Sequence, residues 1–329
     1  MKILLVGGAG YIGSAIAFHL LDQGHDPGVF DNFSTGSPKA VPSGVFLQEG
    51  DCGDEAAVRQ ALATFRPDAV IQLAASVRVD ESMTDPWKYY FNNTTKSLNL
   101  FHACAVHGVR DIVFSSTAAV YGEPTRELID ESVPTLPVNP YGHSKLASEF
   151  MLKDIARVSG MRATILRYFN VAGADLRMRT GQRTQAATHL VKVASEVAAG
   201  IRPELNIFGT DYPTPDGTCV RDYIHVMDLA LAHELVLLKP GQAGETRIFN
   251  CGYGTGHSVR EVVNAFNTVL GRSLPTRDMP RRAGDPPALA CDASRLKNDL
   301  GWTPRHASIG KIVETALAWE RHQRSTASA

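Results

Sequence analysis

Tyr141 and Lys145 are the residues whose types and spacing most directly suggest chemistry. They lie four positions apart in the stretch PVNPYGHSKLASEF, and residues at i and i+4 share one face of a helix. Asn139 suits a helix N-cap and Pro140 suits the first helical position, so a helix is predicted to begin here. A phenol beside an ammonium group can exchange protons with a substrate hydroxyl. The same spacing arises by chance in roughly one chain of this size in four, so the pair alone does not define a site.

Three hydroxyl side chains close an apolar run, DIVFSST, that is typical of a buried strand. They are Ser115, Ser116 and Thr117. Reacting groups in a doubly wound sheet gather beyond the carboxyl ends of the strands, so these hydroxyls either cap the strand end or form part of a reaction site. In the second case Thr117, Tyr141 and Lys145 meet over one nicotinamide. The nearby positive charges would then lower the pKa of Tyr141 from its reference value of about 10.

A glycine-rich turn, GGAGYIG, follows the apolar run KILLV and precedes a helical pattern. Gly7, Gly10 and Gly13 would let backbone N–H groups and the helix N-terminus approach a pyrophosphate. Asp31 ends the second strand, where a carboxylate binds the adenosine ribose and repels a 2′-phosphate. This favours NAD over NADP, unless Asp31 is a surface-loop residue. Asp51 ends the third strand and either caps the next helix or reaches the adenine edge.

The first half of the chain alternates apolar strands with helical patterns, which predicts a doubly wound parallel sheet covered on both faces, an α/β Rossmann fold. Strands are expected at KILLV, PGVFD, VFLQEGD, AVIQLAA, DIVFSST and ATILRYFN. Helices are expected over 12–23, 54–65 and 88–107 and from Asn139 onward. We assign residues 1–170 to this dinucleotide-binding domain.

Beyond residue 170 the pattern loosens into Gly-, Pro- and Asp-rich connections such as FGTDYPTPDGT. Helices are expected over 185–199 and 226–238. Residues 171–329 are predicted to form a smaller C-terminal α/β lobe that builds ligand specificity. The strand-like RIFNCG at 247–252 is a candidate to rejoin the first sheet, so segments near 220–252 would pack back on the first domain.

Composition and charge exclude several classes of function. The 329 residues are 44% hydrophobic and 20% charged, with a net charge of -1. This gives no basic field for nucleic acid and no polybasic segment for a membrane surface. No apolar run is long enough to span a membrane and the first residues lack a signal-peptide pattern, so a cytoplasmic protein is expected. The five cysteines form no C-x-x-C pair, which predicts buried, reduced thiols and no metal site.

The sequence resembles the UDP-glucose (UDP-galactose) 4-epimerase family of the extended short-chain dehydrogenase/reductase superfamily. The resemblance runs over nearly the whole chain, through GGAGYIG, DNFSTG, EGD, ES...DP...YY..N, FSST..VYG, NPYGHSK, LRYFNVAGA, FGTDYPTPDGTCVRDYIHVMDLA and RRAGDPPAL. The glycine turn and Tyr-x-x-x-Lys belong to the superfamily at large, whereas DGT..RDYIHV.DLA is much more specific. The resemblance implies an NAD-dependent isomerase of carbohydrate and galactose metabolism.

The resemblance also implies roles for individual residues. Tyr141 would be the acid/base, Lys145 would hold the nicotinamide ribose and lower the pKa of Tyr141, and Thr117 would hydrogen-bond the reacting sugar oxygen. The implied NAD-binding residues are Gly7, Gly10, Tyr11, Ile12, Gly13, Asp31, Asn32, Asp51, Cys52, Leu73, Ala74, Ala75, Asn92, Ser115, Tyr141, Lys145 and Phe169. The implied UDP-sugar-binding residues are Thr117, Tyr141, Asn170, His189, Leu190, Leu205, Phe208, Arg221, Arg282, Asp285 and Leu289. The fork geometry of the Arg221 and Arg282 guanidinium groups suits a diphosphate. Without the resemblance, both would be interpreted as surface residues in ion pairs.

The implied reaction oxidises C4 of the hexose to a ketone, lets the keto sugar turn over in the pocket, and reduces it on the opposite face. No net redox change occurs, so NAD stays bound and most of the binding energy comes from the UDP end. The resemblance further implies a homodimer that pairs through the helices matching about 88–107 and 140–157.

Three positions qualify the resemblance. His189 stands where many relatives have Asn, and Val77 stands where some members carry a Lys near the cofactor. Leu289 falls at the position that gates N-acetyl groups: a small residue there admits them and a large aromatic one excludes them. The leucine side chain is intermediate in size, which predicts activity mainly on UDP-glucose and UDP-galactose.

Other functions fit parts of the sequence. A nucleotide-sugar 4,6-dehydratase needs an Asp-Glu pair directly after the Thr, whereas Ala118 and Ala119 follow Thr117 here. Epimerisation of a UDP-N-acetylhexosamine, or epimerisation or decarboxylation of a UDP-pentose or UDP-uronic acid, would change only a few sugar contacts. A non-catalytic NAD-binding regulator would keep the fold and lose the chemistry, which the intact Tyr141 and Lys145 argue against.

Overall fold

A seven-stranded sheet forms the centre of the computed structural model, which describes residues 1–124, 126, 128–184, 187–282 and 285–327. The strands lie in the order β11-β7-β5-β4-β1-β2-β3, and all neighbours run parallel. They are β1 (Lys2–Val6), β2 (Asp26–Asp31), β3 (Phe46–Glu49), β4 (Ala69–Gln72), β5 (Asp111–Thr117), β7 (Arg162–Tyr168) and β11 (Thr246–Cys251). The predicted doubly wound Rossmann fold is confirmed.

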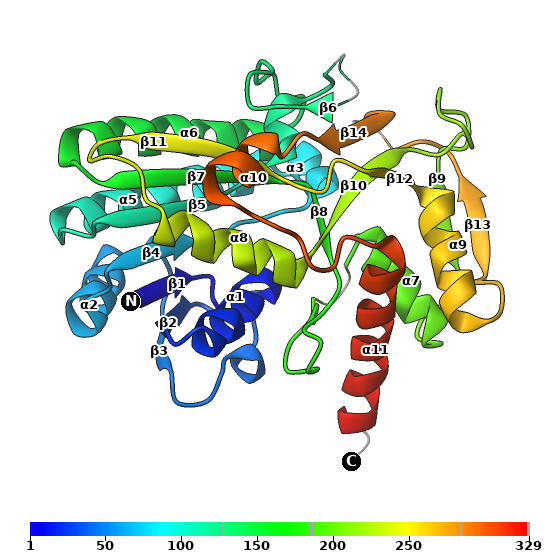
Figure 1. The fold of residues 1–329 in the computed structure, drawn as a ribbon, viewed down its shortest axis with the longest axis horizontal. Coiled ribbons are helices and arrows are strands. Elements are labelled where there is room, and N and C mark those ends of the chain that lie inside the picture. The colour runs from blue at the N-terminus through cyan, green and yellow to red at the C-terminus, as the bar shows by residue number, and fades with distance from the viewer. Residues whose placement is uncertain (125, 127, 185–186, 283–284, 328–329) are drawn as a thin grey trace.

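Helices cover both faces of this sheet (Figure 1). One layer contains α1 (Tyr11–Asp22) and α8 (Val226–Leu238), and the other contains α2 (Glu55–Phe65), α5 (Lys96–Val106) and α6 (Pro140–Ser159). Each layer buries its own hydrophobic cluster against the sheet. Because both faces are packed, the carboxyl edge of the sheet is the surface on which polar groups can gather.

A second lobe is built on smaller sheets and three packed helices. Its strands are β6 (Leu128–Ile129), β8 (Asn170–Ala172), β9 (Leu205–Phe208), β10 (Val220–His225), β12 (Gly256–Ser258), β13 (Thr276–Met279) and β14 (Ala288–Cys291). β10 pairs with β8, β12 and β14, while β9 pairs with β13. The helices α7 (Leu190–Ala198), α9 (Val259–Leu270) and α11 (Ile309–Ala327) share one core, and α10 (Ser294–Leu300) packs on the first domain. Short 3₁₀ turns occupy Pro38–Ala40 and Ala118–Tyr121.

The chain returns to the first sheet after building part of the second lobe. β11 pairs with β7, with Thr246 opposite Ala163 and Cys251 opposite Tyr168. α8 packs against α1 on the same face of the sheet. The predicted return of RIFNCG to the first sheet is therefore confirmed, whereas the boundary near residue 170 stays a prediction.

Two buried acids from the RDYIHVMDLA stretch hold the lobes together. Asp222 accepts hydrogen bonds from the backbone N–H groups of Tyr253 (2.9 Å) and Cys291 (3.1 Å). Asp228 accepts one from the N–H of Arg305 (2.8 Å). Both carboxylates are almost fully buried, so they support the structure and do not face a ligand.

The helix predicted over 88–107 is confirmed, because residues 86–106 are helical without a break, but one turn in its first half is π-helical and not α-helical. α3 (Val79–Thr84) and α4 (Pro86–Tyr89) come first, one π-helical turn spans Tyr90–Thr95, and α5 follows. A π-helical turn inserts an extra residue into the helix and is frequent at functional sites.

Asn93 accounts for the π-helical turn. Its Oδ1 accepts a hydrogen bond from the N–H of Ser76 (2.7 Å), and its Nδ2 donates to the carbonyl of Ser76 (3.0 Å) and to Oγ of Ser144 (3.0 Å). These partners lie on the loop after β4 and on α6. Apolar periodicity carries no information on such long-range contacts.

The helix predicted over 185–199 begins later than expected. α7 starts at Leu190, because His189 has an extended backbone and serves as the N-cap residue. Residues 187–188 are not helical, and residues 185–186 lie outside the described residues. The helix predicted over 226–238 matches α8.

The predicted state of the cysteines is confirmed, since all five are buried and none forms a disulfide. In the described part of the chain, no helix combines the length and the apolar character needed to cross a bilayer. The location of the protein in the cell stays a prediction.

Candidate active site

The glycine turn after β1 leaves a helix N-terminus open. Gly7 has a positive φ of 83°, and a Cβ at Gly13 would lie 2.5 Å from the carbonyl oxygen of Gly7, so α1 packs directly on the turn. Gly10 is the N-cap residue and supplies no side-chain hydrogen bond. The first N–H groups of a helix have no partners within the helix, so this N-terminus is suited to bind a pyrophosphate.

Asp31 ends β2 beside this turn and is 7% exposed, so the surface-loop alternative is wrong. Its Oδ2 accepts a hydrogen bond from the N–H of Ala9 (2.9 Å) and its Oδ1 accepts one from the N–H of Phe33 (2.8 Å). Burial raises the pKa of Asp31, and these two hydrogen bonds oppose the rise. The carboxylate thus joins the glycine turn to the loop after β2, at the position predicted for the adenosine ribose.

Asp51 does not cap the next helix, because Asp54 does so through the N–H groups at the start of α2. The carboxylate of Asp51 accepts hydrogen bonds from Nζ of Lys96 (2.7 Å) and Nδ2 of Asn32 (2.8 Å). Burial alone would raise the pKa of Asp51, but the hydrogen bonds from Lys96, Gly53 and Asn32 outweigh it and hold the pKa below its usual value. Asp51 and Asn32 therefore lie side by side, as two cofactor residues should.

The loop after β4 lies against the glycine turn. The N–H groups of Leu73 and Ala74 both donate to the carbonyl of Val6, at 2.8 and 3.1 Å. A Cβ at Gly7 would lie only 2.6 Å from the nitrogen of Ala74. The predicted cofactor segment, Leu73, Ala74 and Ala75, thus closes one side of the turn.

Arg183 is a residue that sequence reasoning missed. A small hollow beside the glycine turn is lined by Ala9, Gly10, Tyr11, Thr35, Ser37, Ala40, Gly181, Arg183 and Thr184. The Arg183 guanidinium lies 4.7 Å from the ring centroid of Trp319, and its buried Nε has no hydrogen-bond partner among the described residues. Burial lowers the pKa of Arg183. An unpaired guanidinium N–H next to an uncapped helix N-terminus fits the phosphates of a dinucleotide.

The start of α6 is set by the predicted cap. Asn139 Oδ1 accepts a hydrogen bond from the N–H of Gly142 (2.8 Å), and Pro140 occupies the first helical position. A Cβ at Gly142 would lie 2.6 Å from the carbonyl oxygen of Ala119. The first turn of α6 therefore packs directly on the 3₁₀ turn that follows Thr117.

Tyr141 and Thr117 meet at the carboxyl edge of the sheet. The hydroxyl of Thr117 is close enough to that of Tyr141 to lower its pKa, and Thr117 Oγ1 accepts a hydrogen bond from the N–H of Ala119 (3.2 Å). Thr117 therefore caps the strand end and also faces Tyr141. The two alternatives for this hydroxyl, a cap and a part of a reaction site, are compatible with each other. The ring of Tyr89 contacts the ring of Tyr141 edge-on, with centroids 6.3 Å apart.

The lowering of the Tyr141 pKa by Lys145 together with an oxidised nicotinamide stays a prediction, because the protein groups alone act in the opposite direction. Burial raises the pKa of Tyr141, and the Thr117 hydroxyl opposes the rise. Lys145 is 3% exposed, and its Nζ lies 4.2 Å from the ring centroid of Phe114. Burial also lowers the pKa of Lys145 to about 7, an effect that Glu149 opposes. Burial therefore disfavours the charged form of Lys145, and Glu149 favours it.

The three hydroxyls at the end of β5 point to different faces of the sheet, since side chains alternate along a strand. Ser116 donates a hydrogen bond to Oε1 of Glu149 (2.5 Å) and is buried in the layer under α6. Ser115 and Thr117 share the other face. The structure thus brings Thr117 to Tyr141 and takes Ser116 away from the reacting groups.

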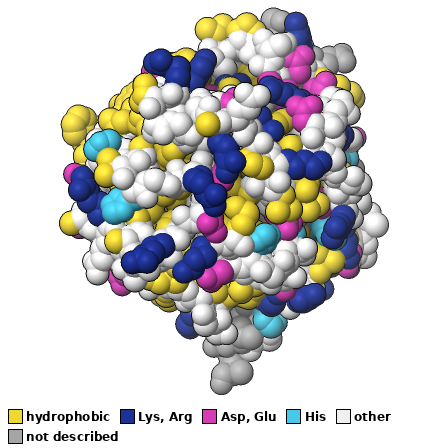
Figure 2. All heavy atoms as spheres, turned by 60° about the vertical axis from the view of Figure 1, so that its left-hand side comes forward, with side chains coloured by type: hydrophobic (Ala, Val, Ile, Leu, Met, Phe, Trp, Pro, Cys, Tyr) yellow, Lys and Arg dark blue, Asp and Glu magenta, His cyan; other side chains and the backbone are white. Residues whose placement is uncertain are grey.

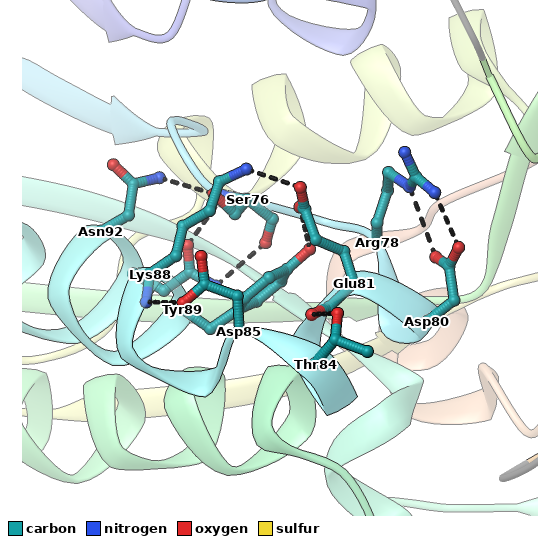
Figure 3. Close-up of polar contacts among 10 residues, drawn as sticks. Ser76, Arg78, Asp80, Glu81, Thr84, Asp85, Lys88, Tyr89 and Asn92 are labelled. Carbon is teal, nitrogen blue, oxygen red and sulfur yellow. Dashed lines mark hydrogen bonds and ion pairs between the residues drawn. The ribbon is translucent and has the colours of Figure 1, made fainter.

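Figure 3 shows the polar contacts of the segment that leads from β4 to α5. The hydroxyl of Tyr89 donates to Oε2 of Glu81 (2.8 Å), and Nζ of Lys88 pairs with Oε1 of the same carboxylate (2.7 Å). Asn92, a predicted cofactor residue, donates from Nδ2 to Oγ of Ser76 (3.1 Å). These contacts join α3, α4, the π-helical turn and the loop after β4 to one another.

Arg221, Arg282, Asp285 and Phe208 gather in the second lobe. Nη1 of Arg221 donates to the carbonyls of Val220 and Pro286, both at 2.8 Å, and its Nη2 lies 3.4 Å from Oδ1 of Asp285. The guanidinium of Arg282 stacks on the ring of Phe208, 3.8 Å from the centroid. Two arginines on adjoining segments suit a diphosphate and a flat aromatic base.

The other predicted sugar and nucleotide residues lie in or near the second lobe. Leu289 stands opposite Arg221 in the pairing of β14 with β10. Asn170 begins β8, and His189 precedes α7 with its Nδ1 3.2 Å from Nε2 of Gln182. Burial lowers the pKa of His189, which favours the neutral ring. Leu205 is buried in the core of the second lobe.

Three positions predicted near the cofactor differ in exposure. Cys52 is 7% exposed after β3, and Phe169 is 7% exposed in the core of the first domain. Val77 is 49% exposed in the loop after β4. The predicted UDP-sugar-binding residue Leu190 is the first residue of α7.

The open helix N-terminus, the buried Asp31 and the Tyr-x-x-x-Lys pair on one sheet edge define a dinucleotide-dependent enzyme of the Rossmann type. The chain belongs to the NAD dependent epimerase/dehydratase family, whose sequence model matches residues 3–252.

Comparisons with known proteins agree on a narrower group. A UDP-glucose 4-epimerase from Azospirillum brasilense is 51% identical over 320 residues, which cover 97% of this chain and 92% of that protein. The structure of a UDP-glucose 4-epimerase from Bifidobacterium longum in complex with NAD+ and UDP superposes with a TM-score of 0.94 at 36% identity, covering 98% of this chain and 99% of that one. The UDP-Glc/GlcNAc 4-epimerase from Campylobacter jejuni has a TM-score of 0.83 at 44% identity, with 98% and 99% covered.

Replacing Arg183 tests its contribution to cofactor binding. We expect Arg183→Met to weaken NAD binding roughly 10- to 100-fold, because a charge-assisted hydrogen bond contributes about 1.5–3 kcal/mol. Isothermal titration calorimetry of NAD into cofactor-stripped protein measures the effect. Arg281→Met is the matched control, since that guanidinium also stacks on an aromatic ring, that of Tyr212, 4.2 Å away. Unchanged affinity in a folded Arg183 variant would contradict the assignment.

Proposed function

We propose that this protein catalyses the reversible 4-epimerisation of UDP-glucose and UDP-galactose with bound NAD. The observation that carries the proposal is the packing of the first turn of α6 on the turn after Thr117, which brings Tyr141 and Thr117 together at the edge of the sheet that also holds the glycine turn. The similarity to UDP-glucose 4-epimerases over almost the whole chain supports the same reaction.

In this proposal Tyr141 moves the proton of the C4 hydroxyl. The phenolate accepts that proton as C4 becomes a ketone, and the phenol returns it when the ketone is reduced. Thr117 donates a hydrogen bond to the reacting oxygens, which stabilises the charge that develops on them. When bound, NAD supplies the redox step, taking the hydrogen of C4 with its electron pair and returning it to the opposite face of the sugar.

Burial of Tyr141 sets the condition under which it can act as a base. Because burial raises its pKa, the phenolate forms only when positive charge is near. Lys145, one helical turn away on α6, is the cation in reach. We therefore assign Lys145 two tasks, holding the nicotinamide ribose and supplying charge to Tyr141.

The residues of the second lobe indicate which end of the substrate is held firmly, the UDP end, and which end is free to turn, the sugar. Arg221 and Arg282 would bind the diphosphate, with Phe208 on the side of the base, whereas Leu205 is buried and supports the strand that carries Phe208. The keto sugar must turn over between two reductions, so the nucleotide end has to carry most of the binding energy. The cluster of Arg221, Arg282 and Asp285 supports this division.

A second candidate function is epimerisation of N-acetylated UDP-sugars. The relative from Campylobacter jejuni is named for UDP-Glc and GlcNAc, and Leu289 is the residue predicted to gate the N-acetyl group here. A leucine leaves less room than a small residue would. We therefore propose UDP-glucose and UDP-galactose as the main substrates.

The dehydratase alternative receives no support from the described geometry. The backbone after Thr117 continues into a 3₁₀ turn in which Ala118 is buried in the core. Neither Ala118 nor Ala119 carries a group that can transfer a proton.

We also propose that the protein is a homodimer. The outer sides of α4, α5 and α6 expose large apolar residues: Trp87, Phe91, Leu98, Val106, Phe150 and Val158. Trp87 and Phe91 stack on each other. Figure 2 brings the left-hand side of Figure 1 forward and shows hydrophobic side chains exposed between scattered charged groups. An exposed apolar patch of this kind is typical of a protein interface.

Tyr141→Phe tests the chemical assignment. We expect conversion of UDP-galactose to UDP-glucose, without added cofactor, to fall about 10²- to 10⁴-fold, as it does when a general acid/base is lost. Retained NAD and unchanged circular dichroism would show that fold and cofactor binding are intact. Tyr90→Phe, a change at an exposed tyrosine, is the control. A Tyr141 variant with normal turnover would overturn the mechanism.

Turnover of UDP-N-acetylglucosamine tests the substrate preference. We expect it to be at least about tenfold slower than turnover of UDP-glucose, and Leu289→Ala to narrow the gap by opening the pocket. Leu128→Ala removes a similar side chain from β6, the neighbour of β14, and should leave the ratio unchanged. Equal rates on both sugars in the unmodified enzyme would refute the preference.

Light scattering coupled to gel filtration tests the dimer. We expect a mass of twice the 35.6 kDa of one chain. Phe150→Glu should shift the mass toward one chain, because a charge would be buried at the interface. Ile201→Glu, at an exposed position after α7, should leave it unchanged. A single-chain mass for the unmodified protein would rule the dimer out.

A further inference from the structure

A buried polar cluster lies under α6 and takes no part in the mechanism above. Its centre is Glu149, which is 4% exposed. Arg167 on β7 binds both carboxylate oxygens, with Nε 3.0 Å from Oε1 and Nη2 2.5 Å from Oε2. Ser116 on β5 donates a third hydrogen bond to Oε1. Arg167 is held in turn by the hydroxyl of Tyr121 at 3.0 Å.

The cluster fixes its carboxylate on the same face of α6 as Lys145. Glu149 follows Lys145 by four residues, which places the two side chains one turn apart. Both are almost fully buried. Burying the three polar partners of Glu149 is costly, although two of the three hydrogen bonds belong to its ion pair with Arg167. An apolar residue in place of Glu149 would fill the same space. The arrangement therefore calls for a role beyond packing.

Other charged or titratable groups lie on the elements around Lys145. They include Tyr141 and His143 on its own helix, Arg167 and Tyr168 on β7, Cys104 on α5, Tyr121 on the 3₁₀ turn, Tyr89 on α4 and Glu81 on α3. Glu81 is paired with Lys88 and Tyr89, and β5 presents the ring of Phe114. Burial lowers the pKa of Lys145 to about 7, and Glu149 is the group that raises it.

We propose that Glu149 is a positioning residue that keeps Lys145 in its charged form, and that Ser116 and Arg167 hold the carboxylate in place for this task. The inference rests on the proposed function, in which Lys145 supplies positive charge to Tyr141. Glu149 touches neither substrate nor cofactor. It acts through Lys145, and its effect is therefore greatest at the pH where Lys145 would otherwise lose its proton.

The pH dependence of turnover separates this role from simple packing. Removing the carboxylate lowers the pKa of Lys145 further, so the charged form disappears at lower pH. We expect Glu149→Gln to move the alkaline limb of the kcat profile down by about one pH unit or more. A purely structural role would lower kcat by the same factor at every pH, and that result would overturn the proposal.

Ser116→Ala is the matched control, because it removes one hydrogen bond to Glu149 and keeps the carboxylate and both bonds from Arg167. We expect its alkaline limb to stay at the position of the unmodified enzyme. An equal shift in both variants would show that packing, and not the charge of Glu149, sets the limb. The proposal would then be wrong.

A direct titration of Lys145 distinguishes failure of this inference from failure of the proposed function. The ε-carbon resonance of Lys145, in protein labelled with ¹³C-lysine and carrying its bound NAD, is identified by its loss in Lys145→Arg. We expect it to titrate at lower pH in Glu149→Gln than in the unmodified protein, whatever sugar the enzyme turns over. Coincident titrations would overturn the inference.

Glu149→Gln leaves Arg167 buried without its partner and could prevent folding. The double variant Glu149→Met with Arg167→Met removes both charges and keeps the volume. Lys145 should again titrate at lower pH in this variant, because burial then acts on it unopposed. An unchanged titration in the folded double variant would also refute the role of Glu149.

Discussion

Close contact between the first turn of α6 and the end of β5 is the constraint on which the site depends. Gly142 has no room for a side chain, because a Cβ there would lie 2.6 Å from the carbonyl oxygen of Ala119. The N-cap bond from Gly142 to Asn139 fixes where the turn begins. Tyr141 is therefore placed by backbone contacts on both sides, and its hydroxyl reaches Thr117 without help from a flexible loop.

The parallel sheet gathers the remaining groups. β1, β2, β4 and β5 all end at one edge, so the glycine turn, Asp31, the 73–75 loop and Thr117 meet there although they are far apart in the sequence. Neighbouring side chains of β10 point to opposite faces of its sheet. Arg221 faces Asp285, while Asp222 next to it is buried and accepts hydrogen bonds from backbone N–H groups.

Most of the fold, and the meeting of Tyr141 and Thr117 at one edge of the sheet, could be predicted from local sequence signals. Alternating apolar strands and helices indicated the sheet, and Asn-Pro indicated the start of α6. Features that depend on distant partners could not be predicted. The π-helical turn depends on bonds from Asn93 to Ser76 and Ser144, and Arg183 and Glu149 carry no motif. The burial that raises the pKa of Tyr141 is likewise a property of the packed structure and carries no local signal.

The anchoring of Arg221 has a consequence for affinity. Its guanidinium already donates to two backbone carbonyls at 2.8 Å and faces Asp285. An arginine side chain gives up about 2 kcal/mol of rotamer entropy when it is immobilised. Here that loss occurs during folding, so it would not weaken the association with a diphosphate in the function that we propose. Preorganisation of this kind would let the nucleotide end bind firmly while the hexose turns over.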